Sequence, residues 1–318
     1  MTSNQSLEGI TVIDCSQILA GPFCSMLLAD HGARVIKVEK PNGGDDVRFW
    51  GPPFIGDDSS AFVQLNRNKE SISLDIKEEE GKKILTKLIK KSDVLIENSR
   101  VGTMEKLGFG YEDVKKINSK IIYCSITGFG TDGPYAKRGG FDLIAQGMSG
   151  LMSITGHPDS PPAKVGVPIA DLNTGMFAMQ GILSAYIHRL KNNEGQNLEV
   201  SLLESALAYT MYESSIFFTT GRISSPDGSA HRLTAPYQAF KTKDGYINIG
   251  AANQSNWERL LTVLNLENLK DDPEFIDSKS RQINRKKLEN ILEVIFITKS
   301  SKEWIGILIK NSIPSGPI

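Results

Sequence analysis

The feature that most constrains the fold is an alternation of short apolar segments with amphipathic helical patterns in the first two-thirds of the chain. Apolar runs of strand length occur at 10–14, 34–39, 72–75, 94–97 and 121–126. Helical patterns lie between them at 23–31, after the loop Ala20-Gly21-Pro22, and at 78–91. Such alternation is typical of βαβ units with a mainly parallel sheet. We therefore predict an α/β fold in which a doubly wound, Rossmann-like domain binds ligands at the carboxyl ends of its strands.

The sequence pattern changes beyond residue 222. Residues 224–229 are rich in serine, proline and glycine, which is typical of a linker. Segment 237–249 predicts a hairpin, and amphipathic helices are expected at 254–264, 285–297 and 302–310. The predicted organisation is a large α/β domain at 1–222, a linker at 223–235 and a smaller α+β domain at 236–318.

The charge balance argues against several classes of partner. With 36 basic and 37 acidic residues, the chain is expected to bind neither nucleic acid nor a membrane surface. No apolar run reaches the roughly 18 residues of a membrane span. The three cysteines are widely spaced, as free thiols in a reducing compartment are, and the four histidines show no metal-ligand spacing. The short polar N-terminus resembles neither a signal nor a transit peptide, so a cytoplasmic protein without a metal is expected.

One carboxylate stands at a chemically favourable place. Residues 166–176 lead from a loop into a helix whose apolar positions recur every three or four residues from Leu172 onward. Asp171 then falls in the first helical turn, where free N–H groups and the helix dipole favour a negative charge. A carboxylate kept ionised at neutral pH is a potential nucleophile. The alternative, from the residues alone, is an ordinary N-terminal cap.

The opening strand–loop–helix–strand pattern, which ends at Glu39, imitates a dinucleotide-binding unit. Its loop holds a single glycine, Gly21, where the fingerprint of such units has three. The missing glycines would keep a pyrophosphate away from the backbone, so NAD binding is disfavoured.

Cations and amides gather after several of the predicted strands. A typical surface lysine is merely solvated, but an α/β sheet binds its ligands where its strands end, so a local site for a phosphorylated ligand is expected. The candidates are Lys40, Arg48, Asn66, Arg67, Asn68, Lys69, Lys77, Asn98, Arg100, Lys106, Lys137 and Arg138. The glycine-dense segment 139–150 opens another helix with Asp142 near its start, which by itself indicates only a capping position.

Together these segments resemble the class III CoA-transferase family, also called the formyl-CoA transferase or carnitine CoA-transferase family. The likeness runs in order along the whole chain, at residues 7–10, 20–22, 32–39, 66–69, 74–75, 97–98, 139–150, 166–176 and 236–240. It implies an acyl-CoA and a small carboxylic acid as substrates, no metal, and an interlocked homodimer. Residues 313–318 match a turn that the family follows with a further segment returning to the first domain. A fragment or truncated product is therefore expected, and the interlocked homodimer is expected where that further segment is present.

The resemblance gives Asp171 the role of nucleophile. It implies attack on a donor thioester to form an aspartyl–acyl anhydride, then an aspartyl-CoA thioester, and a second anhydride that passes CoA to the acceptor. It places Leu19 and Ala20 at the pantetheine, and Leu74 and Asn98 at the nucleotide. Lys40, Lys77, Lys106 and Arg138 would face the phosphates or the adenine. Three further residues are expected in the CoA site without a more exact place: Ser99, Arg100 and Asp142.

Two alternatives remain open within the same fold. Acyl-CoA racemases carry a histidine directly before the position of Asp142, whereas Phe141 stands there and cannot shuttle a proton, so racemisation is disfavoured. The other alternative is a non-catalytic CoA-binding fragment, because a missing tail would leave the site incomplete.

The resemblance also bears on the acids. Leu19, Ser99 and the lack of a glycine-rich loop between 226 and 237 differ from the formyl-CoA transferases, which disfavours formate and oxalate. Residues 50–54, 121–128 and 239–246 most resemble family members that act on dicarboxylates. A small dicarboxylate, with succinyl-CoA as the donor, is therefore expected.

Overall fold

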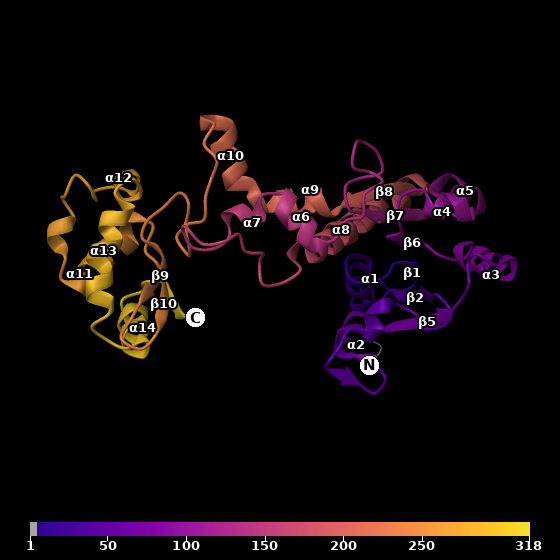
Figure 1. Cartoon of the computed structure of the whole chain (residues 1–318), viewed down its shortest axis with the longest axis horizontal. Coiled ribbons are helices and arrows are strands. Elements are labelled where there is room, and N and C mark those ends of the chain that lie inside the picture. Colours follow the sequence, from indigo (N-terminus) through magenta and orange to yellow (C-terminus); the bar gives the residue numbers. More distant parts are fainter. Residues whose placement is uncertain (1–4) are drawn as a thin grey trace. The chain divides into compact units, whose positions relative to one another are not determined.

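The structure is a computed structural model that describes residues 5–318 and divides into two compact units (Figure 1). The first unit comprises the chain up to Ser153 together with Lys164–Ser215, and the second comprises Ile154–Ala163 together with Ile216–Ile318. The chain therefore enters the second unit briefly, returns, and leaves again after Ser215. This boundary precedes the linker predicted at 223–235, and no sequence pattern marks the brief excursion.

The first unit is built on a six-stranded sheet. Its strands in spatial order are β5 (Lys69–Ser73), β2 (Arg34–Glu39), β1 (Thr11–Asp14), β6 (Val94–Glu97), β7 (Ile122–Thr127) and β8 (Gln196–Ser201). All neighbouring strands are parallel. Counted along the chain, the order is that of a doubly wound sheet whose winding direction reverses between β1 and β6. The predicted α/β fold class is confirmed.

The edge strands are the places where the strand predictions failed. The strand predicted at 72–75 is β5, which begins earlier, at Lys69, and β8 has no predicted counterpart. Each pairs on one side only, and each carries several exposed polar residues. A strand at the edge of a sheet need not be apolar on both faces, so a search for apolar runs misses it. The inner strands are largely buried and confirm their predictions.

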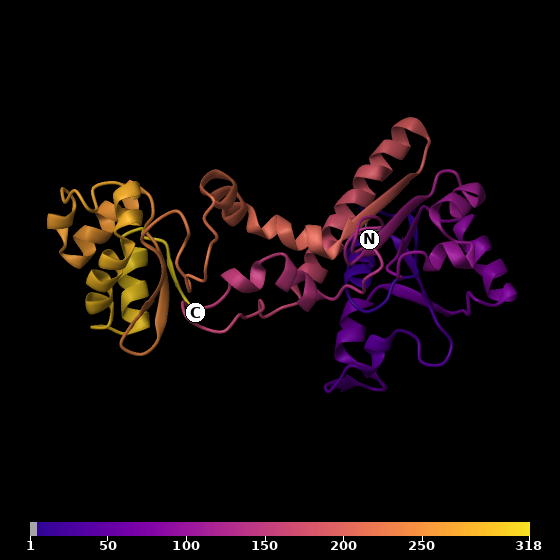
Figure 2. The same cartoon turned by 45° about the horizontal axis from the view of Figure 1, so that its top comes forward.

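Helices cover both faces of the sheet (Figures 1 and 2). On one face, α3 (Glu79–Ile89) and α5 (Tyr111–Ile117) share a core with strand residues such as Ile13 and Leu95. On the other, α1 (Ala20–Asp30) and α8 (Ile169–Asn192) contact each other and the sheet. Helix α1 begins before the predicted 23–31, because Pro22 occupies its first turn, where proline fits, instead of a loop.

The other elements before the second unit are short. They are η1 (Asp46–Phe49), β3 (Phe54–Ile55), β4 (Asp58–Ser59), α2 (Ser60–Leu65), α4 (Thr103–Leu107), α6 (Asp142–Met148), α9 (Leu202–Leu207) and η2 (Ala208–Thr210). Two helices lie across the division between the units, α7 (Leu151–Ile154) and α10 (Met211–Thr220).

A glycine lets α8 cross α1 at close range. A Cβ atom on Gly175 would lie 2.7 Å from the carbonyl oxygen of Ala20 and 2.9 Å from Cδ1 of Phe23. A close-packed interior has no room for such an atom, so any larger residue would push the helices apart. Gly175 follows Asp171 by four positions and therefore lies on the same face of α8. The close crossing brings the first turn of α8 to the loop that follows β1.

The second unit is a small α+β body. Its antiparallel sheet has the order β11-β10-β9, formed by Ser315–Pro317, Tyr246–Gly250 and Tyr237–Lys241. Trp257, Phe240 and Phe296 lie in its core. The predicted hairpin and three predicted helices are confirmed, as α11 (Gln254–Leu264), α13 (Arg285–Phe296) and α14 (Ser301–Lys310). Residues expected in a terminal turn instead form β11, which hydrogen-bonds to β10. Two short elements, η3 (Glu267–Leu269) and α12 (Ser278–Ile283), were not predicted.

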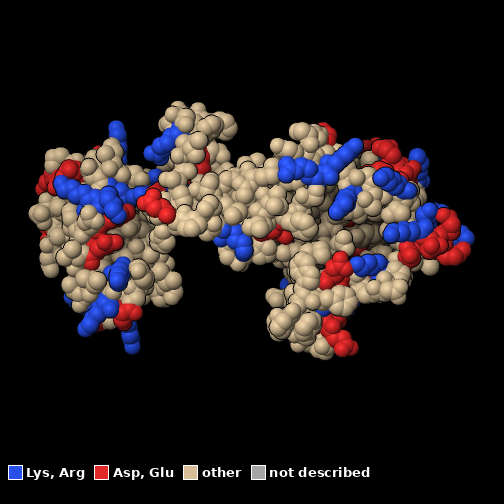
Figure 3. Space-filling model, in the orientation of Figure 1, with Lys and Arg blue, Asp and Glu red and all other residues tan. Residues whose placement is uncertain are grey.

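The surface agrees with the balanced charge. Basic and acidic side chains intermingle over much of the face shown in Figure 3. Within the described residues 5–318, none of the helices combines the length and the hydropathy needed to span a bilayer.

Candidate active site

The loops after β1 and β6 meet where the winding of the sheet reverses. The carboxamide of Asn98 accepts a hydrogen bond from the backbone N–H of Gln17 at 2.8 Å and donates one to the carbonyl oxygen of Gln17 at 2.7 Å. Gln17 lies between β1 and α1, and Asn98 directly follows β6. Open α/β sheets bind ligands at this place, beyond the carboxyl ends of their strands. Two adjoining cavities open here.

The larger cavity, of about 530 Å³, brings most of the predicted site residues together. We call it the Asp171 cavity. The predicted residues that line it are Leu19, Ala20, Asn98, Ser99, Arg100, Lys106, Arg138 and Asp171. Among the described residues that line it, Asp171 is the one acidic group, whereas four are cationic: Arg100, Lys106, Lys137 and Arg138. The cavity therefore combines one carboxylate with a strongly basic wall.

The second cavity, of about 450 Å³, shares Gln17, Ser99 and Thr103 with the first. This Lys40 cavity is lined by the predicted residues Lys40, Leu74 and Lys77. Lys40 forms an ion pair with Asp46 at the exposed edge. Asp171 and all the residues that the family resemblance placed around CoA, except Asp142, line one of the two cavities.

Asp142 is a tertiary cap of the helix that carries Asp171. Its Oδ1 accepts a hydrogen bond from the backbone N–H of Ala170 at 2.9 Å and lies 3.4 Å from that of Asp171. Its Oδ2 accepts one from Nε2 of Gln146 at 2.6 Å. The first turn of α8 has no such cap from its own N-cap residue, Pro168, within the described part of the chain. Asp142 therefore lies outside both cavities and acts on the site through α8.

The predicted place of Asp171 is confirmed, but its pKa is raised where the helix end was expected to hold it low. The residue lies in the first turn of α8. Burial, and secondly the charge of Asp142, raises the pKa of Asp171 from 3.8 to about 7. Asp142 accepts from the N–H of Ala170 and lies beside that of Asp171, so its negative charge opposes the positive end of the helix at Asp171. At neutral pH, the carboxyl is divided between its two protonation states.

Several of the predicted cations serve the fold instead of the cavities. Arg48 bonds Glu39 and Asp58, and Arg67 pairs with Asp30. Lys69, 1% exposed, lies 3.2 Å from the buried Asp14. Glu39, the acid that a dinucleotide site would use for a ribose, is thus occupied. Burial would raise its pKa, but bonds from Arg48, from a serine hydroxyl and from a backbone N–H lower it to about 2.

Sequence reasoning missed the residues that shape the wall of the Asp171 cavity. Gly128 and Gly140 both line it, and a Cβ atom on Gly128 would lie 2.6 Å from Cα of Gly140. The two backbones therefore touch, which only glycines allow. The glycine density after residue 139 was the available signal, but the pairing depends on the tertiary fold. Gln17, Ile18 and Thr103 have residue types that do not mark them as site residues.

Comparison with known proteins identifies the class. The profile of CoA-transferase family III matches residues 7–318. The chain belongs to this family and is an enzyme that transfers CoA. Among residues 5–318, no group of three His, Cys, Asp or Glu side chains is placed to hold a metal ion.

Individual relatives are similar over nearly all of the chain. It is 42% identical to the succinyl-CoA:glutarate CoA-transferase of Mus musculus, with 99% of this chain and 72% of the mouse protein covered. It is 38% identical to the acetyl-CoA:oxalate CoA-transferase of Acetobacter aceti, with 98% and 80% covered. A crystal structure of a CAIB/BAIF family protein from Brucella suis matches with a TM-score of 0.86 and 39% identity, covering 99% of this chain and 84% of that one.

Proposed function

We propose that this enzyme moves CoA from an acyl-CoA, with succinyl-CoA as the donor, to a small dicarboxylic acid, and that Asp171 is its nucleophile. The observation that carries the proposal is a single carboxylate in a cationic cavity, at the point of the sheet where α/β folds bind ligands. The similarity to relatives named for succinyl-CoA and glutarate supports this pair of acids.

The cavities suit the two chemical halves of CoA. Lys40, Lys77, Lys106 and Arg138 line them and would attract the phosphate groups. Ala20 begins α1, and within the described part of the chain the N-cap residue Leu19 gives this helix no side-chain cap. Pro22 has no N–H and the N–H of Phe23 bonds the carbonyl oxygen of Leu19, so the N–H groups of Ala20 and Gly21 are those that would meet an anion, such as the thiolate released from CoA.

Asn98 and Asp142 would serve this chemistry indirectly. The carboxamide of Asn98 already holds both backbone groups of Gln17, so its contribution to nucleotide binding runs through the β1–α1 loop. Asp142 orients the first turn of α8 and raises the pKa of Asp171. Both residues therefore position groups that contact CoA.

The reaction proceeds by four exchanges at carbonyl carbons. A carboxylate oxygen of Asp171 attacks the thioester carbonyl of the donor, the C–S bond breaks, and an aspartyl–acyl anhydride forms with CoA thiolate. The thiolate attacks Cγ of Asp171 and releases the donor acid, which leaves an aspartyl-CoA thioester. The acceptor carboxylate displaces the thiolate to form a second anhydride. The thiolate then attacks the acyl carbonyl of the acceptor and returns Asp171 as a carboxylate.

The raised pKa of Asp171 suits a nucleophile. A carboxylate that is buried away from water and has a higher pKa is also more reactive toward a carbonyl carbon than a solvated one. A pKa of about 7 still leaves a large share ionised at neutral pH. The site therefore combines reactivity with availability.

Trapping of the covalent intermediate tests this proposal. The protein is incubated with succinyl-CoA and a panel of acids that includes glutarate and oxalate, treated with hydroxylamine or borohydride, and digested for mass spectrometry. Modification is expected at Asp171, with transfer to glutarate. Modification elsewhere contradicts the mechanism.

Two variants complete the test. Asp171→Asn is expected to abolish transfer while CoA binding stays nearly intact. Asp142→Asn keeps an oxygen that caps α8 and is expected to remain acylated at Asp171. Wild-type turnover in Asp171→Asn would overturn the proposal.

The alternatives predict different outcomes in the same assay. Phe141 lines the Asp171 cavity directly before Asp142 and carries no group that transfers a proton, so exchange of the α-proton of an acyl-CoA into deuterium oxide is not expected. Such exchange without any acceptor acid would favour a racemase. Full CoA affinity without transfer to any acid would favour a non-catalytic CoA-binding fragment.

A homodimer and a cytoplasmic location complete the proposal. Exposed apolar side chains on α6, α8 and α9 of the first unit support the dimer; they include Leu143, Ile144, Met148, Phe177 and Leu207. Exposed apolar groups gathered in this way are typical of surfaces that bind other chains. Light scattering of the purified protein tests the dimer, and a purely monomeric particle would contradict it.

A further inference from the structure

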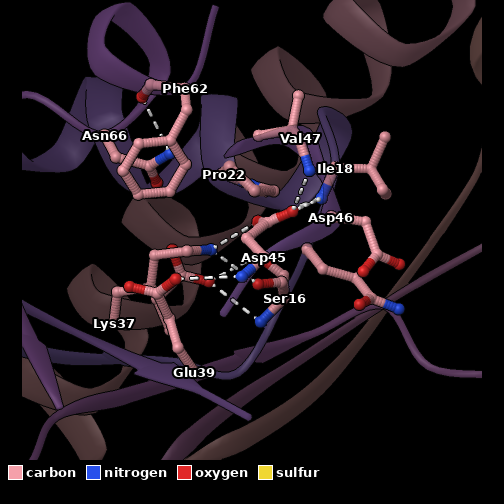
Figure 4. Close-up of polar contacts among 12 residues, drawn as sticks. Ser16, Ile18, Pro22, Lys37, Glu39, Asp45, Asp46, Val47, Phe62 and Asn66 are labelled. Atoms are coloured by element: carbon pink, nitrogen blue, oxygen red, sulfur yellow. Dashed lines mark hydrogen bonds and ion pairs between the residues drawn. The ribbon is translucent and has the colours of Figure 1, made fainter. Parts of the chain in front are cut away.

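A buried ion pair adjoins the loop that lines both cavities. Nζ of Lys37, on β2, lies 2.9 Å from Oδ2 of Asp45, which precedes η1, and each side chain is 1% exposed. Figure 4 shows the Asp45 carboxylate between the Lys37 side chain and the backbone N–H groups of Ile18 and Val47. Neither Lys37 nor Asp45 is explained by the chemistry proposed for Asp171.

The pair reaches the β1–α1 loop at two points. Nζ of Lys37 donates a hydrogen bond to the carbonyl oxygen of Ser16 at 2.9 Å. The N–H of Ile18 lies 3.1 and 3.2 Å from the two carboxylate oxygens of Asp45. Gln17, between them, is held on both of its backbone groups by Asn98. Three consecutive loop residues are therefore fixed by side chains from three separate segments.

The loop conformation needs such restraint. Ile18 has a φ of 70°, in the left-handed region that β-branched residues rarely adopt. Ile18, Leu19 and Ala20 all line the Asp171 cavity. If the N–H of Ile18 were released, the backbone would relax toward a negative φ and move these cavity residues. The shape of the cavity thus depends on the acceptor supplied by Asp45.

Stability alone does not account for the pair. Removing two charges from water costs about as much as their attraction returns, so an apolar pair of similar volume would stabilise the fold as well or better. The neighbouring buried pair of Asp14 and Lys69 balances the local charge. What an apolar pair would lack is a charged acceptor for the N–H of Ile18 and a donor for the carbonyl of Ser16.

We propose that Lys37 and Asp45 are positioning residues for acyl-CoA binding, whose ion pair holds Ile18 in its left-handed conformation so that Leu19 and Ala20 line the cavity beside Asp171. This inference rests on the proposed function, because CoA is taken as the ligand of the loop.

Two readouts on the 318-residue chain test the inference. Hydrogen exchange of the amides at 16–20 reports on the loop without any ligand, and calorimetry with CoA reports on the cavity. Asp45→Ala, which removes the acceptor of the Ile18 N–H, is expected to accelerate exchange in the loop and to weaken CoA binding about tenfold. The double variant Lys37→Met/Asp45→Leu is an apolar pair that leaves no unpaired charge, so it is expected to keep the thermal stability of the wild type while exchange stays fast and affinity weak. Asp113→Asn, which breaks the exposed pair with Lys116, is the matched control and is expected to change neither readout.

A rescue variant separates positioning from general damage. Glycine adopts positive φ without strain, so Ile18→Gly in the Asp45→Ala background is expected to recover part of the CoA affinity, whereas Ile18→Val is not. Unchanged loop exchange and unchanged CoA affinity in the double variant would overturn the inference, as would equal recovery by valine. Wild-type protein that binds no CoA would contradict the proposed function instead, and the exchange readout would still decide the role of the ion pair.

Discussion

Asp142 caps the helix that carries Asp171. One of its carboxylate oxygens lies 2.9 Å from the N–H of Ala170 and 3.4 Å from the N–H of Asp171 itself. The cap places a second negative charge near Asp171, which adds to the effect of burial on its pKa. Asp142, from α6, thus caps the end of α8 at which Asp171 lies. The pKa of Asp171 is raised to about 7.

The rate should therefore fall on the acid side of neutrality. Protonation of Asp171 removes the nucleophile, so kcat/KM is expected to decline as the pH falls through about 7. A pH profile of kcat/KM for transfer from succinyl-CoA measures this decline. A midpoint near the ordinary pKa of an aspartate would contradict the assignment.

Asp142→Asn should move the acid-side decline of kcat/KM to lower pH. The substitution removes the smaller of the two causes of the raised pKa and leaves burial, the larger one, in place. The midpoint is therefore expected to fall without reaching the ordinary value. Asp113→Asn, on the exposed face of α5, serves as the control and should leave the profile unchanged. An identical profile in Asp142→Asn would show that the two carboxyls do not interact.

Asp171→Asn should stabilise the fold at neutral pH. The native protein binds the proton of Asp171 more tightly than the unfolded chain does, because its pKa is about 7 in the fold and 3.8 without it. Binding of this proton therefore stabilises the wild-type fold at low pH, and that stabilisation is lost as the pH rises from about 4 to about 7. Asparagine removes that loss, which is about 4 kcal/mol at most. Thermal melts from pH 4 to pH 8 measure the difference, and a variant with no advantage at pH 8 would contradict it.

Gly175→Ala should destabilise the protein by about 1–3 kcal/mol, because the added Cβ would press on the backbone of Ala20. Gly181 lies on the same helix, and a Cβ there would find its nearest neighbour, Cδ1 of Leu198, at 3.6 Å. Gly181→Ala is therefore the matched control, expected to be neutral or to stabilise by up to about 1 kcal/mol. Urea unfolding compares the two variants. Equal effects would show that the close crossing of α1 and α8 is not tight.

Lys106→Met should raise the KM for succinyl-CoA about tenfold with little change in kcat, because loss of a charged contact to phosphate weakens binding in ground and transition state alike. Steady-state kinetics at two salt concentrations measure it, and the difference from wild type should shrink at high salt. Lys91 is exposed and lines neither cavity, so Lys91→Met is the control. A fall in kcat with unchanged KM would place Lys106 at the chemistry instead.

Much of this architecture follows from the sequence, because the strands inside a doubly wound sheet are covered on both faces and read as apolar runs. The same rule fails for β5 and β8, which are edge strands with polar residues. Asp171 was found because a helical stripe begins directly after it. Its pKa was not, since Asp142 lies 29 positions away and only the fold brings it to α8.

Buried charged residues were the other feature that could not be predicted from the sequence. Lys37, Lys69 and Asp45 are charged residues that a sequence places on the surface, yet the side chains of Lys37 and Lys69 are 1% exposed. Each is buried because a partner of opposite charge lies within reach, and those partners come from other segments. The restraint on the β1–α1 loop could therefore be found only in the structure.

The fate of the acceptor's oxygen tests the central claim most directly. In the proposed sequence of exchanges, an oxygen of the acceptor acid bridges to Asp171 in the second anhydride and stays on Asp171 when the CoA thiolate attacks the acyl carbon of the acceptor. A single turnover with glutarate labelled with ¹⁸O in its carboxylates should therefore leave heavy oxygen on the peptide that contains Asp171, as mass spectrometry would show. Transfer of CoA to glutarate without any label on Asp171 would contradict the account.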